Sequence, residues 1–145
     1  MYRFRLEALL NHRRHQEEVC QKELAQTERQ LADERGNLQR LKEEKRENTK
    51  KLQARQNIHI NVSLIILSIN YVRQLSKNIE KQADCVRVAT RKVNQKRTEL
   101  VVMVKKRKTL EKLKENEQLV YHQKMLQNER KLMDEVASIR HARKM

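Results

Sequence analysis

Few side chains in this sequence have the type and spacing that metal binding requires. His12 and His15 lie three residues apart, so both would share one face of a helix, where two imidazoles and a third ligand can hold a metal ion. No carboxylate or thiol lies four residues after either histidine to complete such a set. Two solvated histidines are the simpler interpretation, and we predict no metal site.

The motifs of common enzymes are also missing. The one glycine, Gly36, does not make a glycine-rich phosphate loop, and there is no G-x-S-x-G sequence. The three tyrosines are too scattered for a base-stacking platform. We therefore predict a non-enzymatic protein with no catalytic residues, no cofactor and no small-molecule substrate.

The two cysteines, Cys20 and Cys85, have no ligand-like spacing. If the chain folds back near residue 58, Cys85 lies beside residues around 32 and far from Cys20, which excludes a disulfide within the chain. We expect both thiols to be free, as is typical of a reducing compartment. Each cysteine would then be a small side chain on or beside a helix seam.

The charge favours acidic partners: nucleic acid, anionic lipid or an acidic protein surface. The net charge is +15. Much of the excess lies between residues 87 and 108, where Glu99 is the only acidic residue. This basic span sits inside a heptad pattern and not before it, unlike the basic region of a DNA-binding dimer, and its alternative interpretation is a solvated coiled-coil flank. It comprises Arg87, Arg91, Lys92, Lys96, Arg97, Lys105, Lys106, Arg107 and Lys108.

A long helix must carry these residues. Apolar side chains recur in steps of three and four, which is the seam of a coiled coil, and the chain has no proline to interrupt it. The spacing predicts a helix over about 63–142, roughly 120 Å long. The seam residues are Val72, Ile79, Val86, Val93 and Leu100, with Leu75, Ala89 and Met103.

A second heptad pattern predicts another helix over about 4–55, roughly 78 Å long. Leu10, Leu24, Leu31, Leu38 and Leu52 occupy one heptad position, and Leu6, Cys20 and Leu41 the other. Gly36 is a flexible point, a close helix approach or a tolerated defect. Polar residues interrupt the seam, either fixing register or facing water: Arg13, Glu17, Thr27, Glu34, Lys45 and Asn48.

The pattern fails between Gln53 and Asn61, so we place a turn at about 56–62. Ile58, Ile60 and Val62 alternate with polar residues, which permits a short extended piece, and Asn61 or Ser63 can cap the next helix. The fold class predicted is all-α: one coiled-coil domain, 1–145, in which two long helices form an antiparallel hairpin and the second overhangs.

Two apolar segments bear on location. The start, Leu6 to Leu10, is too short for a signal peptide, and the run Val62 to Ile69 is less than half the roughly 20 residues that a bilayer requires. We expect a cytoplasmic protein that is peripheral to a membrane at most.

The apolar pattern changes phase between Arg107 and Glu117, where Lys114 and Glu117 take seam positions. A stutter or a frayed end explains such a shift. The pattern then resumes as two adjacent rows, wider than one partner helix requires. Residues 119–140 are therefore a candidate docking surface, and the alternative is a third-strand or crystal-type contact without function. The rows contain Leu119, Leu126 and Met133, with Met125, Leu132 and Ile139 beside them.

Four segments in order resemble one known family. The opening M-Y-R-F-R-L-E-A-L-L-N-H-R is followed by Y-V-R-Q-L-S-K-N-I-E-K-Q (71–82), K-R-K-T-L-E-K-L-K-E (106–115) and E-R-K-L-M-D-E-V-A (129–137). Their order and spacing resemble the FliJ family of the flagellar type III export apparatus.

The resemblance implies a coiled coil similar to the central stalk of rotary ATPases, which promotes assembly and activity of the hexameric export ATPase FliI. Its helix ends would contact that ring. The candidate surface for this contact consists of the apolar rows of residues 119–140 together with Phe4, Leu6 and Leu10 at the start of the chain. It also implies escort of substrate chaperones and a role in flagellum biogenesis and motility, with chemotaxis depending on it. The location implied is the cytoplasmic face of the inner membrane at the flagellar base, held there through partners.

The resemblance further implies binding to the export gate protein FlhA. Carried to the matching segment, this contact falls on Tyr71, Leu75, Asn78 and Gln82, which share one helical face. Asn78 departs from the small apolar residue that the family pattern would have there.

Three other hypotheses remain open at this stage. One is the equivalent stalk of a virulence secretion system, which the sequence hardly separates from the flagellar one. Another is a basic coiled coil that binds nucleic acid, with affinity falling steeply as salt rises. The third is a structural homodimer with one continuous parallel helix, against which the break at 53–61 argues.

Overall fold

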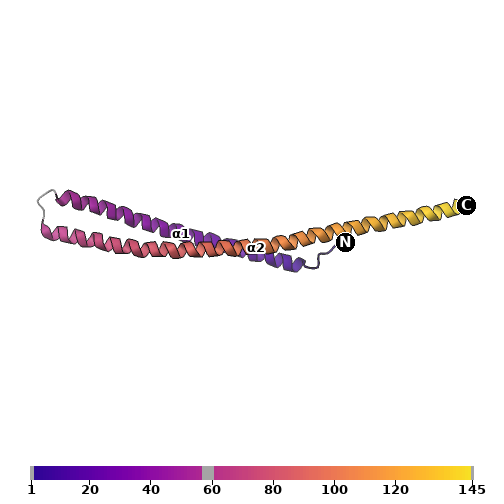
Figure 1. The fold of residues 1–145 in the computed structure, drawn as a ribbon, viewed down its shortest axis with the longest axis horizontal. Coiled ribbons are helices and arrows are strands. Elements are labelled where there is room, and N and C mark those ends of the chain that lie inside the picture. The colour runs from indigo at the N-terminus through magenta and orange to yellow at the C-terminus, as the bar shows by residue number, and fades with distance from the viewer. Residues whose placement is uncertain (1, 57–60, 145) are drawn as a thin grey trace. The chain divides into compact units, whose positions relative to one another are not determined.

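The computed structural model describes residues 2–56 and 61–144, and these form two helices (Figure 1). Helix α1 is Glu7–Gln56 and helix α2 is Val62–Lys144. They pack against each other, and the described residues contain no strand. The predicted all-α helical hairpin is confirmed. Most of the predicted turn, together with Ile58 and Ile60, lies at 57–60, outside the described residues.

The start of α2 has the predicted cap. The Asn61 side-chain oxygen accepts a hydrogen bond from the Ser63 N–H at 3.1 Å, and the Asn61 carbonyl accepts one from the Leu64 N–H at 3.0 Å. Asn61 is therefore the N-cap, and Ser63 belongs to the helix. His141, Arg143 and Lys144 lie in the last turn of α2, where positive charge complements the helix dipole.

Gly36 lies within α1, where a glycine weakens a helix because it gains more freedom on unfolding than alanine does. A Cβ added to Gly36 would have no atom within 4 Å. No close helix approach requires this glycine, so the tolerated defect is the interpretation that the structure favours.

The chain divides into two compact units, and each contains a segment of both helices. Unit 1 comprises Met1–Glu18 and Val101–Met145, and unit 2 comprises Val19–Leu100. In unit 2 the helices run antiparallel: Tyr71 hydrogen-bonds Glu44, and Cys20 reaches the carbonyl of Lys96. In unit 1 the order is the same, since Lys114 pairs with Glu7 and Arg107 with Glu17.

Unit 2 has a narrow apolar core. Leu31, Ala89 and Val93 are buried together, with Leu24 and Val86 packed against them. Val93 is only 1% exposed. These are the heptad positions that the sequence predicted, and their contact explains why α1 and α2 stay paired in a unit this thin.

The polar interruptions of the unit 2 seam are partly buried against the other helix. Thr27, Glu34, Lys45 and Asn48 are all intermediate in exposure. The Thr27 hydroxyl donates to the carbonyl of Leu24 at 2.8 Å, and the Asn48 amide donates to that of Glu44 at 2.8 Å. These two side chains satisfy their polar groups within their own helix, which lets them occupy a seam.

Unit 1 has an ionic seam beside two buried apolar residues, Phe4 and Leu10. Glu17 is 8% exposed and forms an ion pair with Arg107, which also pairs with Glu111 at 2.9 Å. Lys114 pairs with Glu7 at 2.8 Å. Charged residues thus take positions that apolar residues hold in unit 2.

The covered positions of α2 keep their phase within unit 1, contrary to the predicted stutter or frayed end. Arg107, Leu110, Lys114, Glu117 and Tyr121 are all partly buried, in steps of three and four. The Tyr2 hydroxyl donates to Glu117 at 3.2 Å, and the Tyr2 and Tyr121 rings lie 5.4 Å apart. Only the apolar pattern shifts, because ion pairs and an aromatic contact replace aliphatic packing here.

Beyond Tyr121, α2 is uncovered. Every residue from 122 to 144 is exposed, which agrees with the predicted overhang of the second helix. Among the described residues, neither helix contains a stretch long and apolar enough to cross a membrane.

Candidate partner-binding surfaces

The predicted export-gate face turns largely toward α1. Leu75 is only 3% exposed. The Gln82 amide donates to the carbonyl of Glu34 at 3.0 Å, and it also contacts the Glu34 carboxylate. These two residues hold the hairpin together, so they are poorly placed to meet a partner.

The other two residues of that face are accessible to different degrees. Tyr71 is exposed, and its hydroxyl donates to the carboxylate of Glu44. This hydrogen bond raises the pKa of Tyr71 above its usual value, with a smaller contribution from desolvation. Asn78 is partly buried and accepts a hydrogen bond from Gln74 at 3.3 Å. A partner can reach this face at Tyr71 and at the edge of Asn78.

The candidate ATPase-ring surface separates into two sets. Its α2 members are all well exposed, from 54% for Ile139 to 73% for Met133. An open groove of about 390 Å³ runs along the same segment, lined by Leu132, Met133, Val136, Ala137 and Arg140. Its members at the start of the chain are not a free surface, because Phe4 and Leu10 are buried and Leu6 is partly buried.

Four residues of the basic span are engaged in ion pairs. Lys96 pairs with Glu23 at 2.8 Å, Arg97 with Glu28 at 3.3 Å, and Arg107 with Glu17. The hydrogen bond to Glu23 raises the pKa of Lys96, and that to Glu17 raises the pKa of Arg107. Arg87 pairs with Asp84 on its own helix. The remaining basic residues are exposed: Arg91, Lys92, Lys105, Lys106 and Lys108.

This distribution weakens the nucleic-acid hypothesis. Lys96, Arg97 and Arg107 face carboxylates of α1, where a phosphate would have to compete for them. Exposed pairs such as Arg97–Glu28 contribute little stability, but they neutralise charge that a DNA-binding stripe would use. The span is better described as the solvated flank of the hairpin.

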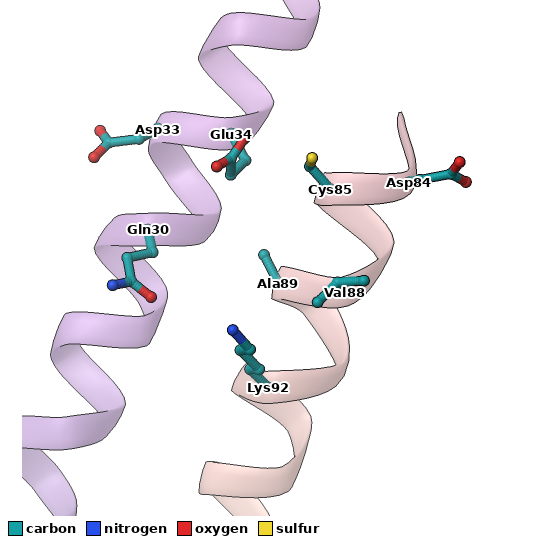
Figure 2. A pocket seen from close by; sticks show the side chains of 8 residues that line it. All are labelled: Gln30, Asp33, Glu34, Asp84, Cys85, Val88, Ala89 and Lys92. Atoms are coloured by element: carbon teal, nitrogen blue, oxygen red, sulfur yellow. The ribbon is translucent and has the colours of Figure 1, made fainter. Parts of the chain in front are cut away.

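An open groove of about 470 Å³ lies between α1 and α2 in unit 2. Figure 2 shows the side chains that line it. Cys85 points toward α1 and lies near Gln30 and Glu34, as the sequence predicted, whereas Asp33 and Asp84, at the two edges of the groove, point away from each other. The acidic groups therefore do not converge. In the part of the chain that the structure describes, no three His, Cys, Asp or Glu side chains are placed to share a metal ion.

The two thiols have different surroundings. Cys20 is buried on the unit 2 seam, and its Sγ lies 3.9 Å from the carbonyl oxygen of Lys96. Burial raises the pKa of the Cys20 thiol. Cys85 is exposed, and both cysteines are free. His12 and His15 are exposed on α1.

Sequence reasoning missed one surface, at the end of unit 2 where α2 begins. Val62, Leu64, Ile66 and Leu67 are all exposed there. The signal in the sequence is the apolar run Val62 to Ile69, which is too short to span a membrane but long enough to form an exposed surface. We call these four residues the hairpin-end patch.

Comparison of the sequence with models of protein families gives a match. The family model described as "Flagellar FliJ protein" matches residues 2–145. The chain belongs to the FliJ family. Members are non-catalytic components of the flagellar export apparatus. Searches of curated proteins and of solved structures gave no match.

Proposed function

We propose that this FliJ-family chain is a non-enzymatic stalk of the flagellar export apparatus. In this proposal it promotes assembly and activity of the export ATPase FliI, binds the export gate FlhA, and escorts or recycles substrate chaperones at the cytoplasmic face of the inner membrane. The observation that carries the proposal is the family match over nearly the whole chain, residues 2–145.

The uncovered part of α2 supports contact with the ATPase ring. Its apolar residues lie on a helix that α1 does not cover, and apolar side chains left exposed in such number mark an interaction site. Phe4 and Leu10, by contrast, act indirectly by anchoring the start of α1 to α2. We therefore assign ring contact to Leu119, Leu126, Leu132, Met133 and Ile139.

The same reasoning narrows the gate contact. Tyr71 and Asn78 are the members of the predicted face that a gate protein can reach, so Tyr71→Ala with Asn78→Ala should weaken FlhA binding without loss of helicity. Leu75→Ala is unsuitable for this test, because Leu75 is buried and its loss would weaken the hairpin. Unchanged FlhA affinity in the Tyr71/Asn78 variant would contradict this assignment.

The function is tested by measuring ATP hydrolysis by FliI with increasing amounts of this protein, with duplex DNA as a competitor in a parallel series. Saturable stimulation with ring assembly, insensitive to DNA, is expected. No stimulation, with tight salt-sensitive DNA binding, would replace the stalk by the nucleic-acid hypothesis. Stimulation of a virulence-type ATPase in preference to FliI would assign the chain to that secretion system.

A pair of variants tests the surface. Leu126→Ser with Met133→Ser should reduce stimulation at least roughly tenfold, since it removes two exposed apolar contacts. The matched control is Val88→Ser with Val101→Ser, which alters two exposed apolar residues of α2 outside the uncovered segment. Equal loss of stimulation in both variants would reject the uncovered segment as the ring contact.

A further inference from the structure

The hairpin-end patch is apolar on more than one side of the helix. Val62 is 67% exposed, Leu64 48%, Ile66 53% and Leu67 66%. Successive helical residues turn by about 100°, so Leu64 and Ile66 point to nearly opposite sides. Ile65 and Ile69, both partly buried, fill the side between them. Within the first two turns of α2, Ser63 and Ser68 are the only polar residues, and neither is charged, so the segment is apolar on several sides.

Positive charge predominates around this patch, and the nearest acidic side chain with a contact to this part of α2 is Glu44, which accepts a hydrogen bond from Tyr71. The sequence contains no Asp or Glu between Glu47 and Glu80. Five basic residues in that interval are exposed, and no ion pair of theirs occurs among the described residues. We call them the basic collar: Lys50, Lys51, Arg55, Arg73 and Lys77.

Both helices bring the collar to the patch. Asn48 of α1 and Leu67, Asn70 and Tyr71 of α2 line one groove in unit 2, which places the end of α1 beside the start of α2. Lys50, Lys51 and Arg55 follow Asn48 on α1, so they lie toward the patch. Arg73 and Lys77 follow it on α2, within roughly 10–20 Å along the helix.

We propose that the end of unit 2 binds directly to an anionic lipid bilayer surface, with the patch in the interface and the collar among the headgroups. A groove on a protein takes one apolar stripe of a helix, whereas a segment apolar on several sides suits surroundings that are apolar on all sides. Apolar side chains at a membrane surface are buried roughly 5–10 Å into the boundary between headgroups and acyl chains, and the two helical turns of the patch span roughly 11 Å. Long lysine and arginine side chains reach headgroup phosphates while their stems stay in the interface.

The uncovered part of α2 does not share this chemistry. Its exposed apolar residues alternate with Glu129, Asp134 and Glu135 as well as with basic residues. Carboxylates there would be repelled by an anionic surface, because like charges raise the energy of approach. This segment therefore supplies control variants of equal exposure.

Vesicle binding of the full chain tests the proposal. Vesicles of phosphatidylcholine alone are compared with vesicles that also contain phosphatidylglycerol, at low and moderate salt. Binding that requires phosphatidylglycerol is expected. Lys50→Gln with Lys51→Gln should weaken it roughly 30-fold, because each basic residue near the surface contributes about a fivefold effect. Lys105→Gln with Lys106→Gln carries the same charge change and should have little effect.

Depth is read from an introduced tryptophan, since the chain has none. Ile66→Trp should show a blue-shifted emission on anionic vesicles, and Leu126→Trp should not. Circular dichroism of each variant confirms that helicity is retained. An equal loss of vesicle affinity in the two lysine variants would show that only net charge matters and would overturn the proposal. An equal blue shift of the emission at both tryptophans would also overturn it, because binding would then not be specific to the patch. Absence of vesicle binding would likewise overturn the proposal. A blue shift of Ile66→Trp that appears without vesicles when the protein concentration is raised would overturn it in favour of self-association.

Discussion

The two units share one spacing of covered positions but fill them with different chemistry. In unit 2, Leu31, Ala89 and Val93 form an aliphatic core, and ion pairs such as Arg97–Glu28 lie at the surface. In unit 1, Glu17 and Arg107 lie on the seam itself, and Lys114 and Glu117 take further seam positions.

Aliphatic contacts stabilise a pair of helices without favouring one register, whereas a charge on a seam requires its partner at one position. We infer that unit 2 supplies most of the stability of the hairpin, and that unit 1 selects the alignment of its own two helix segments. The following variants test this division, from the largest expected effect to the smallest.

Val93→Ala should be the most destabilising, because it removes buried methyl groups from the core of unit 2. We expect a loss of about 2 kcal/mol in the free energy of unfolding. Thermal unfolding followed by circular dichroism measures it. Val101→Ala removes the same groups from an exposed position and should change stability by less than about 0.5 kcal/mol. Equal losses would show that burial at Val93 is not what stabilises unit 2.

Gly36→Ala should stabilise unit 2 by about 1 kcal/mol, because alanine favours the helix and the added Cβ meets no atom within 4 Å. A midpoint raised by roughly 2–4 °C is the expected result. A lowered midpoint would mean that the helix needs its flexible point at this position.

Glu17→Gln should have the smallest effect of the three, since Arg107 keeps Glu111 as a partner and glutamine can still accept a hydrogen bond. We expect the midpoint to fall by roughly 1–2 °C and to depend less on salt than that of the unaltered chain. Glu28→Gln is the matched control, because it breaks an exposed pair of unit 2 and should leave the midpoint unchanged. Identical salt dependence in the two variants would remove the distinction between the units.

Much of the architecture was predictable from the sequence. The heptads predicted helices at about 4–55 and 63–142, and the structure has them at Glu7–Gln56 and Val62–Lys144. Asn61 was one of two proposed caps and is the one used. Antiparallel pairing also placed Cys85 near residue 32, where it lies beside Gln30 and Glu34. Periodicity works here because two helices in contact leave few other ways to bury a stripe.

The seam of unit 1 was not predictable in the same way. A heptad assignment based on apolar residues loses its phase at Arg107, because it assumes that every charged side chain is exposed to solvent. The structure keeps these positions covered, because each charge meets an opposite charge or a hydroxyl on the other helix segment. Recognising that requires the register of the two helices, which periodicity alone does not specify.

The candidate surfaces show the same limit. Leu75 and Gln82 share a helical face with Tyr71, but a shared face does not reveal which neighbour covers it, and here α1 takes Leu75 and Gln82. Phe4 and Leu10 likewise resembled a free apolar end and are buried.

By itself the sequence determined the helical hairpin, the excess positive charge and the family of this chain, because composition, heptad spacing and ordered motifs are properties of the chain alone. The tertiary structure decided which apolar residues are core and which are left for partners, and which basic residues carry neutralised charge. The physical reason is that the burial and the charge pairing of each residue depend on which side chains of the other helix face it, and the register of the two packed helices determines those neighbours.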